Sequence, residues 1–178
     1  MKKSLIIGLM VFLAFGTSNG FAQKGNLSFG IITTQFHNND GDARISEIDN
    51  PLGLGAIVGY QINSRVGVGV TAEYFNDNMQ NFSGTEKDFR GNLSFFIFPV
   101  SFNRLHPYIS AGAIYTHREQ NFDDGRNRNK NWIDARMGAG LDINLFRNIN
   151  LNTDLGVYSD GLNVVGWGSS VGLRFALR

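Results

Sequence analysis

Cysteine is absent from this sequence, and its 178 residues include only 3 prolines and 17% charged residues. The lack of cysteine excludes a disulfide framework and a zinc site with cysteine ligands. Few prolines together with 12% aromatic residues argue against a disordered chain, and a net charge of +1 gives no general signature of nucleic-acid binding. The length suits one compact domain.

Long hydrophobic runs are also missing, and the longest lies near the start of the chain. Leu5–Phe15 is apolar, follows the positive Lys2 and Lys3, and precedes the small residues Gly20 and Ala22. A bilayer-spanning helix needs about 20 apolar residues. The pattern therefore predicts a cleaved signal peptide at residues 1–22, and a mature β-barrel domain at residues 23–178 outside the cytoplasm. A retained membrane anchor is the alternative.

The mature sequence shows a period of two residues and no amphipathic helical period. Val66, Val68 and Val70 alternate with glycines, for example, and seven other segments alternate in the same way. We expect eight antiparallel strands, each long enough for the roughly 9–11 residues of a tilted membrane strand. The apolar rows begin at Leu27, Leu52, Val66, Phe89, Ile109, Ile133, Ile149 and Val165.

The predicted connections alternate in length. Long polar linkers are expected at His37–Pro51, Asn76–Asp88 and Glu119–Asn131, with a shorter one at Ser159–Asn163, whereas the other connections are tight turns. Most of the long linkers are acidic. This layout predicts an all-β fold, an eight-stranded antiparallel up-and-down transmembrane β-barrel.

The second face of each strand is polar or glycine, which fits two kinds of barrel. A soluble lipocalin-like barrel would turn its apolar face inward, and a membrane barrel would turn it towards lipid. Glycines suit a crowded interior, and aromatic residues near strand ends suit the two membrane interfaces, so we predict that the apolar face points outward. The predicted interfacial aromatics are Tyr60, Tyr74, Phe89, Tyr115, Trp132 and Trp167.

This orientation places four acids and four arginines inside the barrel. Because an isolated buried charge is costly, we expect a neutral interior in which these groups are paired, with aromatic side chains filling the remaining space. The aromatic side chains expected inside are Phe96, Phe98, Tyr108 and Tyr158. The predicted interior polar network is Glu73, Arg90, Arg118, Asp134, Arg136, Asp142, Asp154 and Arg174.

Two segments resemble a known family. Pro107–Tyr115 after a short turn, and the closing Val171–Phe175, are similar to small eight-stranded outer-membrane β-barrel proteins of the OmpX and opacity-protein type. The resemblance implies an outer-membrane location, insertion by the barrel-assembly machinery, and contact with outer-membrane lipids and lipopolysaccharide. It also implies a role in envelope structure or surface interaction, and we expect a monomer that binds no nucleic acid.

Candidate chemistry is sparse. His37, His106 and His117 are expected too far apart for one metal site, and no serine is placed to act as a nucleophile beside a histidine. The acidic run Asn38–Asp49 lacks the EF-hand register, so a weak divalent-cation site there is only an alternative. We therefore expect a non-enzymatic barrel without metal or cofactor. A minor small-solute channel and an outer-membrane lipid-modifying enzyme are the alternatives.

Overall fold

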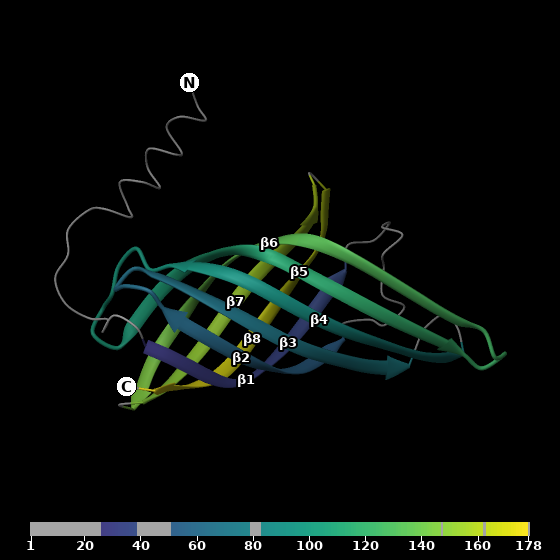
Figure 1. Ribbon diagram of the computed structural model, residues 1–178, viewed down its shortest axis with the longest axis horizontal. Helices are drawn as coiled ribbons and strands as arrows, with labels where there is room; N and C mark the ends of the chain where they lie inside the picture. The colour runs from purple at the N-terminus through teal and green to yellow at the C-terminus, as the bar shows by residue number, and fades with distance from the viewer. Residues whose placement is uncertain (1–25, 39–50, 79–82, 147, 162, 178) are drawn as a thin grey trace, which may run out of the picture.

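Eight antiparallel strands close into a barrel in the computed structural model, which describes residues 26–38, 51–78, 83–146, 148–161 and 163–177 (Figure 1). The predicted signal peptide and most of the first linker lie outside these residues. No helix in the described ranges is long and apolar enough to cross a membrane. The strands are β1 (Asn26–Asn38), β2 (Leu52–Gln61), β3 (Val66–Asn78), β4 (Gly84–Ile97), β5 (Leu105–Phe122), β6 (Asn127–Phe146), β7 (Ile149–Asp160) and β8 (Asn163–Leu177).

Each strand pairs with its neighbour in sequence, and β1 also pairs with β8. This last pairing runs from Leu27 opposite Leu177 to Asn38 opposite Gly166, and it closes the sheet. A ring pair lies near each end of the seam: Phe29 packs on Phe175 with centroids 5.9 Å apart, and His37 stacks on Trp167 at 3.9 Å. The predicted up-and-down topology of eight strands is confirmed.

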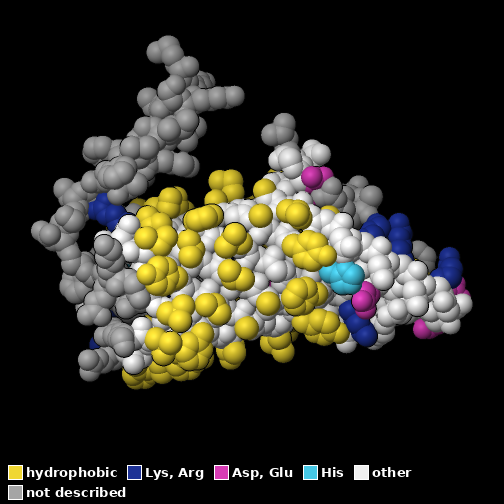
Figure 2. Space-filling view, viewed as in Figure 1, with side chains coloured by type: hydrophobic (Ala, Val, Ile, Leu, Met, Phe, Trp, Pro, Cys, Tyr) yellow, Lys and Arg dark blue, Asp and Glu magenta, His cyan; other side chains and the backbone are white. Residues whose placement is uncertain are grey.

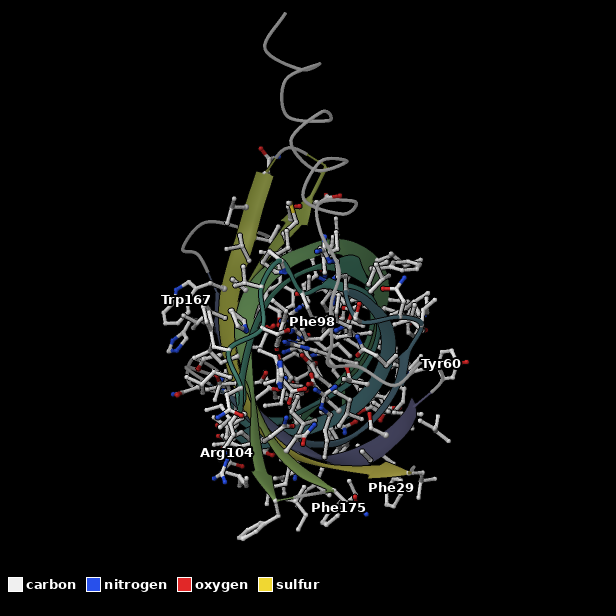
Figure 3. All side chains as sticks on the ribbon, turned by 90° about the vertical axis from the view of Figure 1, so that its left-hand side faces the viewer. Phe29, Tyr60, Phe98, Arg104, Trp167 and Phe175 are labelled. Atoms are coloured by element: carbon white, nitrogen blue, oxygen red, sulfur yellow. The ribbon has the colours of Figure 1, made fainter. Side chains whose placement is uncertain are left out.

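The apolar rows face outward, as predicted. Ile31, Leu54 and Ile133 expose 66%, 70% and 67% of their surfaces, which water would disfavour but lipid would cover. Hydrophobic side chains form a band across the visible face of the barrel, and most of the visible charged side chains, together with histidine, lie beyond its right-hand end (Figure 2). The opposite rows point into the barrel, where side chains fill the space seen along its axis (Figure 3).

Most of the predicted interfacial aromatics lie on the outer surface, and Trp132 does not. Tyr60, Tyr74, Phe89, Tyr115 and Trp167 are all exposed on the outer face. Trp132 belongs to the inward row of β6, where its Nε1 donates a 2.8 Å hydrogen bond to Asp134 and its ring lies under Arg118. The prediction for Trp132 is wrong because this residue shares its strand face with Asp134.

Short connections gather at one end of the barrel, which we call the turn end. There the Asn63 side chain accepts hydrogen bonds from the backbone N–H groups of Arg65 and Val66, at 2.8 and 2.9 Å. This local bond fixes the turn between β2 and β3. The opposite end, where the longer linkers were predicted, is called the loop end.

Two of the predicted long linkers are largely strand. β3 continues to Asn78 and β4 starts at Gly84, so little of Asn76–Asp88 is loop. The linker predicted at Glu119–Asn131 is a β-hairpin whose turn contains Gly125, at a φ of 85° that glycine adopts readily. These segments are polar on both faces because the outer face lies beyond the apolar band and the inner face carries polar residues, which removes the apolar alternation expected of a strand.

The β5–β6 hairpin rises beyond its neighbour β7. β6 pairs with β7 only from Ala135 to Phe146, whereas it pairs with β5 from Asn127 to Ile143. The outer parts of β5 and β6 therefore project beyond β7 at the loop end as an arm, which extends away from the β7–β8 hairpin (Figure 1). On its other side the arm stays paired with β4, up to Phe122 opposite Gly84.

A β-bulge redirects Val165. The register between β7 and β8 shifts between Tyr158 and Ser159, which leaves Val165 without a residue opposite it. The sequence pattern assigned Val165 to the lipid-facing row, but the extra residue turns its side chain inward, and only 7% of it is exposed.

Candidate functional site: the barrel interior

All eight side chains predicted for the interior network are buried inside the barrel. Two ion pairs join members of this set: Arg136 with Asp154, and Arg174 with Asp142. Each pair links strands that lie side by side or close together, because the inward rows of a narrow barrel converge on its axis. The charges of these pairs are thereby compensated where water is excluded.

Two further acids, Glu86 and Asp88, are buried, although the sequence pattern predicts them in an outside loop. Their exposed fractions are 0% and 2%. The signal was present in the spacing, because Glu86 and Asp88 lie four and two residues before Arg90 and so share its strand face. Among the described residues, buried carboxylates outnumber buried arginines six to four, so the prediction of a neutral interior is wrong for this set.

The two missed acids organise the loop end of the interior. Arg118 reaches Asp88 through Nε at 2.8 Å and Glu86 through the same nitrogen at 3.2 Å. Arg90 donates to the Oδ2 atom of Asp88 at 3.0 Å, an atom that also accepts a hydrogen bond from Arg118. Gln120 adds a 2.8 Å hydrogen bond to Glu86, which completes a buried polar cluster between β4 and β5.

An apolar cluster lies beside this polar group. Its members are Phe36, Phe75, Ile114, Tyr158 and Val165, all buried. The guanidinium of Arg90 sits over the rings of Phe36 and Phe75, at 4.1 and 4.4 Å from their centroids. We call this arrangement the outer closure, since it fills the barrel towards the loop end.

Aromatic side chains also fill the barrel nearer the turn end. Tyr108 packs edge-on against Phe96, with centroids 5.3 Å apart, and lies 5.7 Å from Phe98. Its hydroxyl donates to the Thr153 carbonyl at 3.1 Å and accepts a hydrogen bond from the Asn152 amide. We call this the inner closure. The four aromatic residues predicted inside the barrel lie in these two closures.

The three histidines lie apart from one another, in different settings. His37 stacks on Trp167, His106 contacts Asn144 at 2.9 Å, and His117 contacts Asn131 and Glu119 on the outer surface of the arm. Within the described ranges, no group of three or more histidine, aspartate or glutamate side chains is arranged to hold a metal ion. Most of the acidic run Asn38–Asp49 lies outside those ranges.

Comparison with known proteins places this architecture among outer-membrane barrels. A family model described as the OprF membrane domain matches residues 1–177. The N-terminal β-barrel domain of Pseudomonas aeruginosa OprF superposes with a TM-score of 0.59 at 15% identity, covering 86% of this chain and 98% of that one. No curated protein sequence matches the chain.

Two further solved structures share the fold. The outer-membrane protein OprG of Pseudomonas aeruginosa has a TM-score of 0.67 at 15% identity, covering 88% of this chain and 97% of its own. Ail of Yersinia pestis, solved with the heparin analogue sucrose octasulfate, has a TM-score of 0.61 at 14% identity, with coverages of 87% and 100%. At these identities the likeness concerns the fold, and the family match places the protein in the outer membrane.

Proposed function

The chain belongs to the OprF membrane domain family, and we propose that it acts as a non-enzymatic outer-membrane anchor that displays the β5–β6 arm at the cell surface. Outer-membrane barrels turn their short connections to the periplasm and their longer ones outward. The turn end would then face the periplasm, and the arm would face the medium.

The closed interior is the observation that carries this proposal. Eight strands leave an interior that side chains can fill, whereas porins with an aqueous channel use about 16–18 strands. Here the outer closure and the inner closure each place several aromatic rings across the barrel. A protein closed in this way suits anchoring better than it suits general solute passage.

The arm supplies the surface for an external partner. Its tip exposes Asp123, Asp124, Arg126 and Arg128, and Asp124 is paired with Arg126 at 2.7 Å. The described part of the arm thus carries charges of both signs. The lipid-facing band would contact outer-membrane lipids, with lipopolysaccharide in the outer leaflet.

A lipid-modifying enzyme would need a nucleophile beside a base on the outer surface. The outward-facing His117 contacts an amide and a carboxylate instead of a hydroxyl. The proposal therefore expects lipid A from cells with and without the protein to have the same mass.

Site-directed labelling tests the display of the arm. Since the chain has no cysteine, a single introduced cysteine reports one position. We expect Asp124→Cys to react with a membrane-impermeant maleimide on intact cells. The matched control, Ser64→Cys in an exposed turn at the opposite end, should react only after the outer membrane is permeabilised. The reverse pattern would contradict the proposed orientation.

Planar-bilayer recording tests the closed interior. The purified full chain should show no stable porin-sized conductance, and a variant lacking residues 119–131 should behave in the same way. Reproducible large single-channel steps that persist in the deletion variant would move the function to solute transport.

A further inference from the structure

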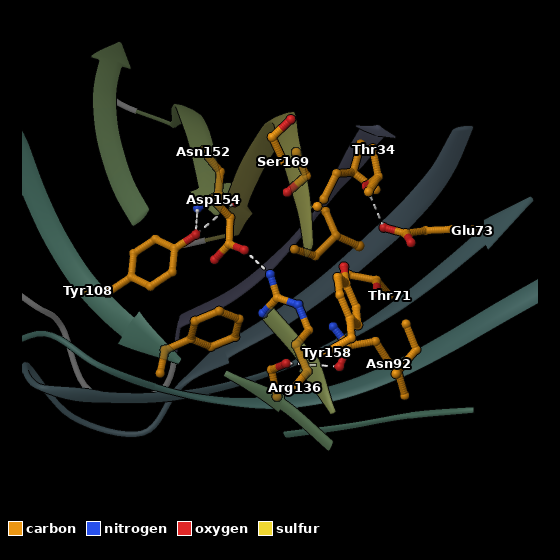
Figure 4. Close-up of a pocket in the computed structure, with 17 residues that line it drawn as sticks. Thr34, Thr71, Glu73, Asn92, Tyr108, Arg136, Asn152, Asp154, Tyr158 and Ser169 are labelled. Atoms are coloured by element: carbon orange, nitrogen blue, oxygen red, sulfur yellow. Dashed lines mark hydrogen bonds and ion pairs between the residues drawn. The ribbon is translucent and has the colours of Figure 1, made fainter. Parts of the chain in front are cut away.

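A small polar chamber lies between the two closures. The cavity measures about 30 Å³ and is lined by Thr34, Thr71, Glu73, Asn92, Arg136 and Asp154, among others (Figure 4). A cavity needs about 10–15 Å³ on this scale to hold one water molecule. The chamber therefore has room for about two occupants of that size.

Two polar atoms that line the chamber lack partners among the described residues of the protein. The hydroxyl of Thr71 and the Oδ2 atom of Asp154 are buried and make no hydrogen bond. Both residues are more than nine-tenths buried. Because an unpaired buried polar atom costs about 1–3 kcal/mol, these atoms indicate that the chamber is occupied.

Among the charged residues that line the chamber, Glu73 has the greatest need of a further partner. Its carboxylate accepts one hydrogen bond, from the Thr34 hydroxyl at 2.8 Å, and no ion pair joins it to another described residue. The two arginines on neighbouring parts of the interior are already engaged. Arg90 is paired with Asp88, and Arg136 is paired with Asp154.

The charges around the chamber do not cancel. Glu73 and Asp154 are acidic and Arg136 is basic, so the lining residues carry one net negative charge. The excess of buried carboxylates in the described interior has the same sign. A buried carboxylate without a counter-charge is strongly destabilising, so a positive occupant would stabilise the chamber.

We propose that the chamber binds one hydrated monovalent cation, held against the Glu73 carboxylate with the Thr71 hydroxyl as a neutral ligand. Carboxylate, hydroxyl and water oxygens are hard ligands that suit such an ion. A divalent cation usually takes several carboxylates at once, and the chamber does not bring them together. The excess negative charge disfavours an anion. This site is independent of the proposed display of the arm.

Thermal unfolding of the refolded full chain tests the cation. The unfolding midpoint is measured in NaCl, in KCl and in N-methylglucamine chloride, at constant ionic strength and at a fixed pH above neutrality. A ligand that binds only the folded state raises the midpoint with its concentration. We expect Na⁺ or K⁺ to raise the midpoint of the native chain relative to the bulky N-methylglucamine.

Variants locate the site. Glu73→Gln should abolish the response to Na⁺ or K⁺, whereas the exposed Asp124→Asn should keep it. If Glu73→Gln does not fold, Thr71→Val serves instead, because it keeps the carboxylate and removes one ligand. It should need about tenfold more cation for the same stabilisation, the effect of one lost polar contact.

Three results would overturn the proposal. A native midpoint that is equal in all three salts would show a chamber filled by water alone. A midpoint that depends on pH and not on Na⁺ or K⁺ would assign the positive charge to a proton on Glu73. A cation response that is undiminished in both Glu73→Gln and Thr71→Val would place the ion elsewhere on the protein.

Discussion

Arg118 and Asp88 form a two-pronged ion pair across neighbouring strands, with Nε donating to Oδ1 and Nη2 donating to Oδ2, each at 2.8 Å. The same guanidinium lies 3.2 Å from Glu86. Two buried carboxylates thus share the charge of Arg118, and Asp88 is also paired with Arg90. Arg suits this role because its planar fork matches a carboxylate and stays charged when buried.

Replacing Arg118 should therefore be costly. Arg118→Ala leaves two buried carboxylates without their shared partner, and breaking a buried pair in this way typically costs about 3–5 kcal/mol. Urea unfolding in lipid vesicles measures the loss of free energy. The control is Arg126→Ala, which removes a solvent-exposed pair at the tip of the arm and should leave the unfolding curve unchanged. Equal curves for the two variants would contradict a stabilising role for the buried pair.

A charge introduced on the outer face should destabilise the barrel more strongly the deeper it lies in the membrane. Ala139 and Leu155 lie opposite each other on β6 and β7, and both side chains are exposed on the apolar band. Lysine at either position should lower the free energy of unfolding by about 2–4 kcal/mol, because it would place an ammonium group in hydrocarbon. Asn129→Lys, on the arm, should have little effect. If all three variants unfold alike, the band does not face lipid.

Glycine on the inner face permits close packing at Gly140. A Cβ atom there would lie 2.5 Å from the Tyr108 hydroxyl oxygen and would also collide with the backbone carbonyl of Thr153. Gly140→Ala should therefore lower the unfolding midpoint. Gly91→Ala provides the matched control, since a Cβ atom at Gly91 meets no atom within 4 Å. A midpoint that falls equally in both variants would point to glycine's backbone freedom as the cause.

His117 should titrate above its ordinary value. It lies one outward-facing position beyond Tyr115, past the apolar band, and its hydrogen bonds to Asn131 and then Glu119 raise its pKa above 6.5. Since the folded pKa is raised, the protonated form stabilises the arm below pH 6.5, and this contribution disappears as the pH rises through the folded pKa. NMR titration of the imidazole protons should give a midpoint above 6.5.

The variant Glu119→Gln isolates the charged partner of His117. It keeps a hydrogen-bonding side chain and removes the carboxylate, so the NMR midpoint should fall towards the ordinary value. An unchanged midpoint in this variant would show that Glu119 does not influence the titration.

The period of two predicted the strands wherever one face meets lipid. Val68 and Val70 alternate with glycines because the two faces of the strand differ. The face towards lipid favours apolar side chains, and the face towards the crowded interior favours small residues. Past Tyr115 that contrast ends, since both faces of the arm lie beyond the apolar band. Residues such as Glu119 and Asn131 therefore look like loop in sequence although they are paired in β5 and β6.

Alternation also failed to place two interior residues, Glu86 and Val165. Glu86 was assigned to a loop because the segment around it has no apolar row, although its spacing from Arg90 placed it on the inward face. Val165 could not be located from alternation, because a bulge adds one residue and reverses the parity for the residues before it. The partners of each arginine depend on strand tilt and register, which composition does not encode.

The β1–β8 seam, held near its two ends by the Phe29–Phe175 and His37–Trp167 ring pairs, also bears on how the barrel assembles. Every other pairing joins strands that follow each other in the chain, whereas this one joins the first strand to the last. Forming this pairing brings together the two most distant strands in the sequence, so it has the largest entropy cost of loop closure in the fold. It also gains least from contacts between residues that are near in sequence. We therefore expect the seam to close late in folding, when the two ring pairs can form at its ends.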